Sequence, residues 1–418
     1  MDRKILHCDM NAFFASVELL EHPELREVPV AVAGDPDSRH GIVVAKNEPA
    51  KRAGVVTAET VQSARRKCPD IVFLPPHHEK YRYYSEKINQ VYLEYTDQVE
   101  PFSVDESWLD VTGSETLFGP APQIADEIRR RIREQVGLTL SAGVSWNKTF
   151  AKMGSEYKKP DATTVITREN YRELLWPLPV GEFFFIGKAT AERLNALHIY
   201  TVGELAQADP KLLQRRFGQH GTDLLRAVNG LDDEPVRRWG DRDDAKSVGH
   251  GLTFRRDLLG FEDVSLAVTE LADRVCSRMR RYGMKAYGVK IEITTPDFRK
   301  VSRQRKLQTP VTTGAAIRRA AMELIREAGY LDKPIRLLTV TAIHLEREDA
   351  PEQLSIYDMM QAEPQQVQAP DEVPAEYGGK DREADQKLEQ AMDAIRSKYG
   401  RSAIRYARGV GNDLGIDE

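Results

Sequence analysis

Apolar and polar positions in the first third of the chain predict a compact unit of mixed strands and helices. Residues 4–8 form an apolar run typical of a strand, and residues 12–20 place Phe13, Val17 and Leu20 at helical spacing. Asp9 therefore stands at the C-terminal end of the first strand. The pattern then predicts short apolar runs alternating with small helical patches over 29–76, a helix over 80–98, a strand-turn-strand over 99–111, a helix over 123–135, and a strand over 138–144 before a helix capped by Ser145.

Residues 175–231 are predicted to be helical. Within them, residues 180–194 read Val-Gly-Glu-Phe-Phe-Phe-Ile-Gly-Lys-Ala-Thr-Ala-Glu-Arg-Leu, which looks like a helix-hairpin-helix element. Such hairpins direct backbone N–H groups and a helix N-terminus at a phosphate. Phe185 stands where the usual Gly-x-Gly pattern has its first glycine, so only Gly187 is left. Phosphate binding and a plain helical turn are equally compatible with this segment.

Residues 246–346 predict a second folding unit. Their pattern reads strand, helix, strand, strand, helix, strand, over 248–254, 264–282, 287–294, 299–307, 314–328 and 335–345. Two helices against a four-strand sheet form a sound small α+β domain. Residues 362–376 are rich in Gln, Pro and Glu, as linkers are. A last helix is predicted over 383–399, with packing as its only expected role.

Composition excludes several classes of protein. A chain of 418 residues predicts two to four domains. No apolar run approaches the roughly 18 residues that a membrane span needs, and the charged N-terminus lacks the features of a signal peptide. We therefore expect a cytoplasmic protein without a membrane role. The scattered Cys8, Cys68 and Cys276 indicate reduced side chains and no zinc site.

Charge is distributed unevenly along the chain. The whole chain carries a net charge of −5, yet residues 245–345 contain 19 Lys and Arg against 10 Asp and Glu. Such a basic segment is suited to an anionic partner, and a polyphosphate backbone is the usual candidate. A solvated basic face without a partner is the alternative.

Two adjacent acids stand out at Asp105 and Glu106. They interrupt an apolar, β-prone run, where carboxylates are costly unless a cation or hydrogen bonds compensate them. Neighbours on a regular strand point to opposite faces, so the two acids can converge on one site only where the chain turns or bulges. From charge and periodicity alone, a surface turn with two solvated acids is the better interpretation.

Four sequence strings change that interpretation. They are Asp-Met-Asn-Ala-Phe-Phe-Ala-Ser-Val-Glu from Asp9, Ser-Val-Asp-Glu-Ser-Trp-Leu-Asp from Ser103, Ser-Ala-Gly-Val-Ser-Trp-Asn-Lys-Thr-Phe-Ala-Lys from Ser141 with Lys158-Lys159-Pro160, and Lys-Ser-Val-Gly-His-Gly from Lys246. Together they resemble the motifs of the Y-family DNA polymerases of the bacterial DNA polymerase IV type. The resemblance runs in order from Ile5 to about Leu345.

The resemblance implies a multidomain α+β fold in the form of a right hand. The expected parts are a ferredoxin-like palm over 1–18 and 77–166, small fingers over 19–76, a helical thumb over 167–238, a linker over 239–245, a four-strand, two-helix little finger that binds DNA over 246–346, and a flexible tail over 347–418.

The resemblance also implies a two-metal active site. Asp9 and Asp105 would bridge two Mg²⁺ ions, with Glu106 completing one site and the Met10 carbonyl the other; Mn²⁺ could substitute. Hard oxygen ligands suit Mg²⁺. Phe14 matches the family's steric gate against ribonucleotides, although a core Phe on an amphipathic helix is what the residues alone favour. The expected triphosphate contacts are Phe13, Lys51 and Lys159.

Two positions near the triphosphate depart from the family pattern. Lys51 replaces the commoner Arg and loses its bidentate fork. Glu48 stands where many relatives have Tyr, so this chain either grips the nucleotide differently or compensates the acid with Lys46 and Arg52. Asn11 replaces a second acid that the ligand set does not require.

The remaining predictions concern macromolecular partners. Primer-template DNA is expected to contact Gly187, Lys148, Lys152, Lys246, Arg255 and Arg256, although Lys148 and Lys152 could equally face solvent. Residues 352–358 resemble the motif that inserts into the bacterial sliding clamp, the β subunit of the replicative polymerase. Gln353 would supply polar contacts, and Leu354, Ile356 and Tyr357 would fill an apolar pocket.

The resulting hypothesis is a monomeric, low-fidelity translesion polymerase that uses deoxynucleoside triphosphates and acts in DNA repair. One alternative is a DNA- and clamp-binding accessory protein that has lost catalysis, which Glu48 and Phe185 make conceivable. A nucleotidyl cyclase can share a palm-like metal site, but it would have no use for a basic little finger or a clamp motif.

Overall fold

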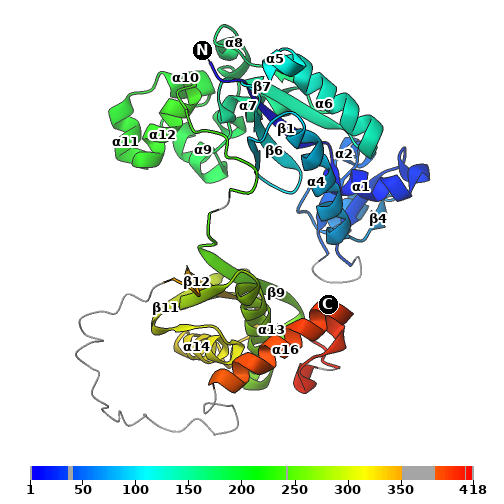
Figure 1. Cartoon of the computed structure of the whole chain (residues 1–418). Coiled ribbons are helices and arrows are strands. Elements are labelled where there is room, and N and C mark those ends of the chain that lie inside the picture. Colours follow the sequence, from blue (N-terminus) through cyan, green and yellow to red (C-terminus); the bar gives the residue numbers. More distant parts are fainter. Residues whose placement is uncertain (1, 36–40, 242, 351–381, 410, 417–418) are drawn as a thin grey trace. The chain divides into compact units, whose positions relative to one another are not determined.

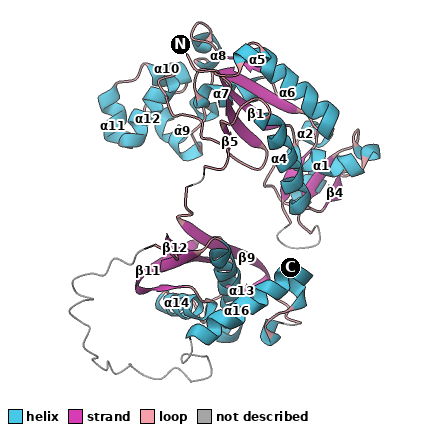
Figure 2. Cartoon of the chain, in the orientation of Figure 1, coloured by secondary structure: helices cyan, strands magenta, loops and turns pink. Residues whose placement is uncertain are grey.

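The structure is a computed structural model that describes residues 2–35, 41–241, 243–350, 382–409 and 411–416 (Figure 1). The chain divides into two compact units, Met1–Arg242 and Asp243–Glu418. Helices and strands are mixed in both (Figure 2), so the predicted multidomain α+β class is confirmed. The predicted clamp-binding residues 353–357 lie outside the described residues.

A five-stranded sheet organises the first unit. Its order is β5 (Val99–Pro101), β6 (Glu106–Asp110), β1 (Ile5–Met10), β7 (Leu140–Ser145) and β8 (Thr163–Val165). The central strand β1 runs antiparallel to both of its neighbours, whereas β7 and β8 are parallel. This central position buries all six residues of β1.

The two faces of this sheet pack against different helices. Leu6, Cys8 and Met10 of β1 face a core that contains α4 (His78–Leu93) and α6 (Ala121–Val136). Helix α6 contributes Ile124, Ile128 and Ile132, spaced by four and fully buried. Each such side chain contributes about 1.5–3 kcal/mol of burial free energy.

On the opposite face lies α7 (Lys148–Tyr157), where Ala151 packs with Ile5 of β1 and Trp108 of β6. Gly143 of β7 permits this contact, because a Cβ there would lie only 1.8 Å from the Ala151 carbonyl oxygen. Helix α7 therefore lies directly against the strands that carry the acids.

Smaller elements complete the first unit. After α1 (Phe13–Glu21) and the 3-10 turn η1 (Pro23–Leu25), a three-stranded sheet has the order β3 (Val43–Lys46), β2 (Val30–Ala33) and β4 (Val72–Leu74), with α2 (Glu48–Arg52) and α3 (Val61–Lys67). The short α5 (Glu115–Phe118) precedes α6. A helical region follows β8, with its own apolar core. It contains α8 (Tyr171–Leu175), η2 (Val180–Glu182), α9 (Lys188–Asn195), α10 (Val202–Ala206), α11 (Pro210–Phe217) and α12 (Gln219–Val228).

The second unit is built on an antiparallel sheet. Its order is β11 (Lys300–Val311), β10 (Met284–Thr294), β12 (Ile335–Arg347) and β9 (Ser247–Leu258). The helices α13 (Gly260–Arg281) and α14 (Gly314–Glu327) contribute to its main core. The element order is the one that the sequence predicts for residues 246–346.

The C-terminal residues pack onto this second unit. Helix α16 (Arg382–Tyr399) is followed by the 3-10 turns η3 (Arg401–Ala403) and η4 (Ala407–Gly409). Leu414 and Ile416 are buried in the main core, and the Leu414 carbonyl accepts a hydrogen bond from the Arg255 amide at 2.9 Å. The predicted last helix is therefore present, and it packs against the rest of the unit as expected. No helix in the described parts of the chain is long and apolar enough to cross a membrane.

Candidate active site

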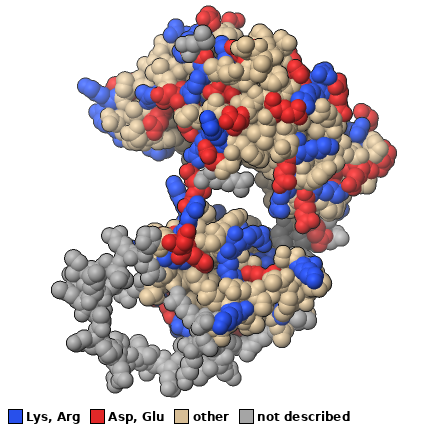
Figure 3. Space-filling view, viewed as in Figure 1, with Lys and Arg blue, Asp and Glu red and all other residues tan. Residues whose placement is uncertain are grey.

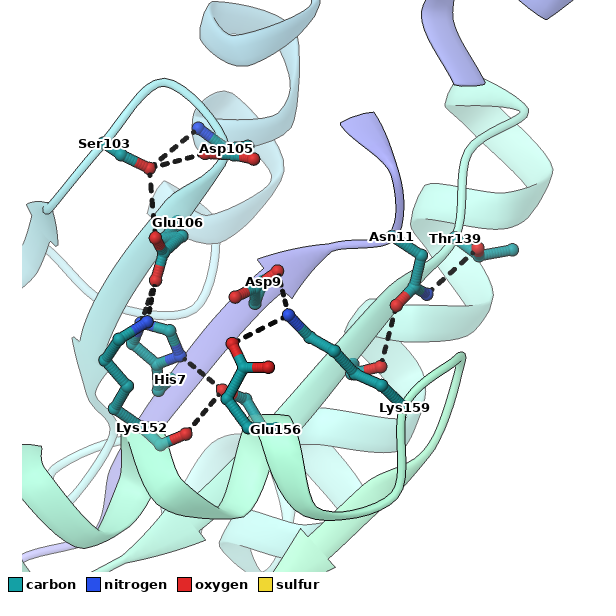
Figure 4. Close-up of polar contacts among 12 residues, drawn as sticks. His7, Asp9, Asn11, Ser103, Asp105, Glu106, Thr139, Lys152, Glu156 and Lys159 are labelled. Atoms are coloured by element: carbon teal, nitrogen blue, oxygen red, sulfur yellow. Dashed lines mark hydrogen bonds and ion pairs between the residues drawn. The ribbon is translucent and has the colours of Figure 1, made fainter. Parts of the chain in front are cut away.

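Two neighbouring strands bring the predicted acids together. In the register of β1 and β6, Asp9 lies directly opposite Glu106 (Figure 4). Asp105 precedes β6 in a bend, and its carbonyl accepts a hydrogen bond from the Met10 amide at 3.0 Å. The predicted turn is therefore present at Asp105, whereas the ligand atoms that lie within 4.8 Å of one another come from His7, Asp9 and Glu106.

Asp9 is a buried carboxylate held by a lysine. It is 5% exposed, and its Oδ1 lies 2.8 Å from Nζ of Lys159. Lys159 also contacts Glu156 at 2.8 Å. Burial raises the pKa of Asp9 to about 7, although the ammonium of Lys159 opposes that rise. A divalent cation at Asp9 would remove this cost.

Two basic groups from the interior lie beside Glu106. Its Oε2 contacts Nζ of Lys152 and lies 3.2 Å from Nε2 of His7. Burial would raise the pKa of Glu106, but the contacts with His7 and Lys152 lower it to about 2. Glu106 is therefore ionised over the whole physiological range and offers a full negative charge.

Asp105 has a weaker set of partners. The hydroxyl of Ser103 donates to its Oδ1 at 2.5 Å, and burial raises its pKa. Among the described residues no cationic side chain forms an ion pair with it. This acid is the one for which a bound cation would bring the largest change of environment.

The donor set fits a hard divalent cation. One ligand atom each from His7, Asp9 and Glu106 lies within 4.8 Å of the other two, and the carboxylate oxygens of Asp105 come from the adjoining bend. Carboxylate oxygens are the ligands that Mg²⁺ and Mn²⁺ prefer, and their burial without a divalent cation is costly. Met10, whose backbone carbonyl is a predicted ligand, is the last residue of β1 and is 3% exposed.

Asn11 takes a structural role beside this site. Its amide bonds to the hydroxyls of Thr139 and Ser141 at 3.1 and 2.9 Å, which fixes the end of β1 against β7. The side chain is occupied by these bonds, in keeping with a ligand set that does not need it.

The two predicted aromatic residues begin α1, immediately after β1. Phe13 is 3% exposed and belongs to the core. Phe14 is half-buried, and its ring stacks on Tyr81 of α4 with centroids 3.9 Å apart and planes 9° from parallel. His78 meets the same ring edge-on at 5.9 Å. Phe14 is therefore held rigidly, with one part of its surface open.

Lys51 lies on α2, away from the strands of the five-stranded sheet. Its Nζ is 3.4 Å from Oε1 of Glu48, and both side chains are exposed. Asn47 caps this helix by accepting from the Ala50 amide at 3.1 Å. Glu48 is paired with Lys51 itself, rather than with Lys46 or Arg52 as the sequence analysis considered.

Lys148 is buried and does not face solvent. Its side chain is 6% exposed and its Nζ lies 2.9 Å from Glu100 and 3.1 Å from Glu234. The ammonium also lies 4.6 Å from the centre of the Trp108 ring. Lys148 therefore pairs with two acids of the first unit, and its DNA contact stays a prediction. Lys152 is likewise directed inward, to Glu106.

The helix-hairpin-helix segment keeps the backbone shape that glycine usually provides. Phe185 has φ 76°, a left-handed conformation that is strained for a bulky residue, and its ring is 57% exposed. Phe184 packs against it with centroids 4.0 Å apart. Gly187 then serves as the N-cap of α9. Phe185 thus replaces glycine without removing the turn.

The predicted contacts of the second unit lie at β9. Lys246 precedes this strand and is exposed, as is Arg255. Arg256 is bound to Asp263 and, through Nε at 2.7 Å, to Asp413.

Acidic and basic side chains are interspersed over the visible face of the first unit (Figure 3).

The residues that lie behind Asp9 and Glu106 were not predicted from the sequence. His7 lies two positions before Asp9, so strand alternation places both on one face. Ser155 and Glu156 follow Lys152 by three and four positions, so helical periodicity groups them on α7. Strand alternation and helical periodicity could both be read from the sequence. Neither pattern shows that α7 packs against the sheet, and this contact is what brings these residues to the acids.

Known proteins share this arrangement of sequence and fold. The impB/mucB/samB family matches residues 8–156, its C-terminal domain residues 245–356, and its HHH motif residues 168–199. A solved structure titled "Y-family DNA polymerase chimera Dbh-Dpo4(243-245)-Dbh" has TM-score 0.74 and 22% identity, and the match covers 82% of this chain and 99% of that chain.

Curated relatives match over nearly their full length. "DNA polymerase IV" of Acetivibrio thermocellus is 39% identical, with 98% of each chain covered. "DNA polymerase IV 1" of Bacillus subtilis is 36% identical, over 96% of this chain and 92% of the relative. The chain therefore belongs to the impB/mucB/samB family.

Proposed function

We propose that this chain, a DNA-directed DNA polymerase, extends primers by two-metal phosphoryl transfer and does so in translesion synthesis and repair, with low fidelity. The observation that supports the mechanism is the register of β1 and β6, which sets Asp9 opposite Glu106, with Asp105 next to Glu106 in the adjoining bend. Buried or half-buried carboxylates at neighbouring positions are stabilised by positive charge, and a polymerase supplies it as divalent ions.

Asp9 and Asp105 would hold both ions, with Glu106 and the Met10 carbonyl each completing one site. Bound there, Mg²⁺ would activate the primer hydroxyl and neutralise the triphosphate charge, and Mn²⁺ could replace it. The protein's own task is then positioning. The β1–β6 register fixes Asp9 opposite Glu106.

The nucleotide would lie beside Phe13, Phe14 and Lys159. Lys159 already contacts Asp9, so its ammonium is well placed to meet a triphosphate at the metal site. Because Phe14 is fixed by its stack on Tyr81, its ring would not yield to a ribose 2′-hydroxyl. Increased ribonucleotide incorporation by Phe14→Ala would support this gate, and unchanged discrimination would contradict it. Lys51 is exposed on α2 and would approach the phosphates from the side of the three-stranded sheet.

Primer-template DNA would contact backbone groups near Gly187 and the basic residues Lys246, Arg255 and Arg256. The strained Phe185 turn retains the N-terminus of α9 for a phosphate. The division into palm, fingers, thumb and little finger, with a linker over 239–245, belongs to this proposal. We also propose that the chain is a monomer and that it binds the sliding clamp through residues 353–357. A variant that lacks residues 353–357 should keep basal synthesis but lose its stimulation by the clamp.

Primer extension with purified chain and Mg²⁺ tests the proposal. Asp105→Asn keeps the size of the side chain but removes its charge, so extension should fall by roughly 10³-fold while binding of primed DNA persists. The control is Glu134→Gln, an exposed acid that pairs with Arg130 on α6. A wild-type chain that binds primed DNA but adds no nucleotide would instead establish the accessory-protein alternative.

A further inference from the structure

Three phenylalanine rings form an apolar surface to which the mechanism above gives no task. Phe185 is 57% exposed and Phe102 is 50% exposed, and the half-buried Phe184 contacts both. The ring centres of Phe184 and Phe185 are 4.0 Å apart, and those of Phe184 and Phe102 are 5.9 Å apart. These three residues, here called the aromatic ledge, connect the turn before α9 with the bend before β6.

The aromatic ledge is anchored on α7 and β6. The backbone N–H of Phe184 donates to Sδ of Met153 on α7 at 3.3 Å. The ring of Phe102 lies 4.9 Å from the ring of Trp108, which is buried on β6. Rings that are already held in place lose little conformational freedom when a ligand binds, so the ledge is a preorganised surface.

Phe185 stands where glycine would be less strained. Its φ of 76° is left-handed, which is unfavourable for a residue with a Cβ and routine for glycine. Burial does not compensate for this strain, because more than half of the ring is exposed. Strain that persists without burial indicates a function of the exposed ring.

The position of the aromatic ledge selects its occupant. Nζ of Lys152 lies 5.6 Å from the centre of the Phe102 ring and 5.4 Å from that of the Phe184 ring. The same ammonium contacts Glu106, a proposed metal ligand. The ledge therefore begins beside the site for the primer 3′ end and continues to the N-terminus of α9, where a phosphate contact is proposed. A primer strand that connects these two points passes over the ledge.

The chemistry of the rings selects the part of the primer that they contact. A phenyl ring has no donor for phosphate oxygens, and the faces of the bases in a duplex are covered by their stacked neighbours. The deoxyribose presents C–H surface, which an apolar ring can cover. A ribose would place its 2′-hydroxyl against a ring that offers it no hydrogen bond, and burial of a polar group in this way is costly.

We propose that the aromatic ledge contacts deoxyribose sugars of the primer strand upstream of its 3′ end and disfavours ribose at those positions. Phe102 is three residues from Asp105, so it contacts the sugar nearer the 3′ end, and Phe185 contacts a sugar farther from it. This inference rests on the proposed function. It differs from the proposed gate at Phe14, which acts on the sugar of the incoming nucleotide.

Primed DNA whose primer carries one ribonucleotide, at successive positions from the 3′ end, tests the proposal. The readout is the Kd of the full chain for each primer relative to the all-deoxyribose primer. The wild type should bind about 3–10-fold more weakly at the positions on the ledge. Phe185→Gly should abolish the penalty at the position farther from the 3′ end. This variant should fold as well as the wild type, since glycine adopts the turn without strain, and urea denaturation checks this.

Tyr83→Ala is the matched control, because Tyr83 is another exposed aromatic residue, on α4 and so on the opposite face of the five-stranded sheet from α7. It should keep the wild-type penalties. Phe102→Ala should remove a penalty nearer the 3′ end than the one that Phe185→Gly removes. Equal binding of every primer by the wild type, unchanged penalties in Phe185→Gly, or the reverse order of the two positions would overturn the proposal.

Failure of this inference can be told apart from failure of the proposed function. If the wild type extends the all-deoxyribose primer but binds every ribonucleotide-containing primer equally well, only the role of the aromatic ledge is lost. If the wild type binds the all-deoxyribose primer and adds no nucleotide to it, the proposed function itself has failed.

Discussion

Each unit contains a cluster of buried charge, and the two clusters are built differently. In the second unit, Arg280 contacts Glu389 and lies 2.8 Å from Asp393, while Arg396 and Arg401 both contact Asp273. All of these cations are guanidinium groups. In the first unit, the cations that contact Asp9 and Glu106 are lysines.

Burial alone does not separate the two clusters. It raises the pKa of Asp9 and Asp105 in the first unit, and also that of Asp273 and Glu389 in the second. What differs is the partner. The guanidinium of Arg280 carries several donors at fixed positions and so contacts Glu389 and Asp393 at once, whereas a lysine is a mobile point charge that a divalent ion can displace. An acid with a raised pKa therefore indicates a functional site only when a ligand can displace its cationic partners.

The largest effect is expected from a substitution in the first cluster, at Asp9. Asp9→Asn should lower primer extension by roughly 10³-fold, because the proposed bridging charge is lost. Its unfolding free energy should stay equal or rise, since ionisation of this buried carboxylate is unfavourable. Extension assays and urea denaturation measure the two effects. A stability loss of several kcal/mol would show instead that Asp9 is a structural acid like those of the second unit.

Arg280→Met should have the opposite profile. It leaves Glu389 and Asp393 without their guanidinium partner and should cost about 3–5 kcal/mol of stability in the second unit. Residual extension at a temperature where the chain is folded should be retained. Urea denaturation checks this, with the neighbouring exposed Arg281→Met as the control, for which a change within about 0.5 kcal/mol is expected.

Adding Glu389→Gln to Arg280→Met sharpens that measurement. In the wild type, an oxygen of Glu389 accepts a hydrogen bond from the Gly314 backbone N–H at 2.8 Å. The side-chain oxygen of the introduced Gln can accept the same bond, and the Gln carries no unpaired charge. The double variant should therefore be more stable than Arg280→Met alone. An additive loss would mean that the two charges do not depend on each other.

The smallest effect comes from exchanging the type of cation. Lys152→Arg would place a fork-shaped donor on Glu106, and the Mg²⁺ concentration for half-maximal extension should rise by about tenfold. The measurement is a Mg²⁺ titration, with folding checked by thermal unfolding. An unchanged Mg²⁺ requirement would show that the mobility of the cationic side chain does not explain the difference between the two clusters.

Local pattern was sufficient for part of the structure. The apolar run over 4–8 predicted Asp9 at the end of the first strand, and β1 ends one residue later, at Met10. The order of elements in residues 246–346 followed from periodicity. The helix predicted over 80–98 ends earlier, at Leu93, and the strand predicted over 138–144 is Leu140–Ser145. These boundary errors arise because helix and strand ends are set by tertiary contacts and caps.

Partners distant in sequence could not be predicted in this way. Lys148 has the spacing of a surface residue, but Glu100 and Glu234 approach it from 48 and 86 residues away and bury it. The role of α16 depends equally on Arg280, which lies 109 residues before Glu389. The turn at Asp105 was expected, but its proximity to Asp9 needed the β1–β6 register.

The hydrogen bond from the Arg255 amide to the Leu414 carbonyl has a consequence for solubility. Strand β9 is at the edge of its sheet, and the unpaired amides of an edge strand are a template on which another chain can add a strand. Leu414 occupies one of these amides and, with Ile416, anchors the C-terminal residues in the core. The same residues that complete the core thus protect the sheet against edge-to-edge aggregation.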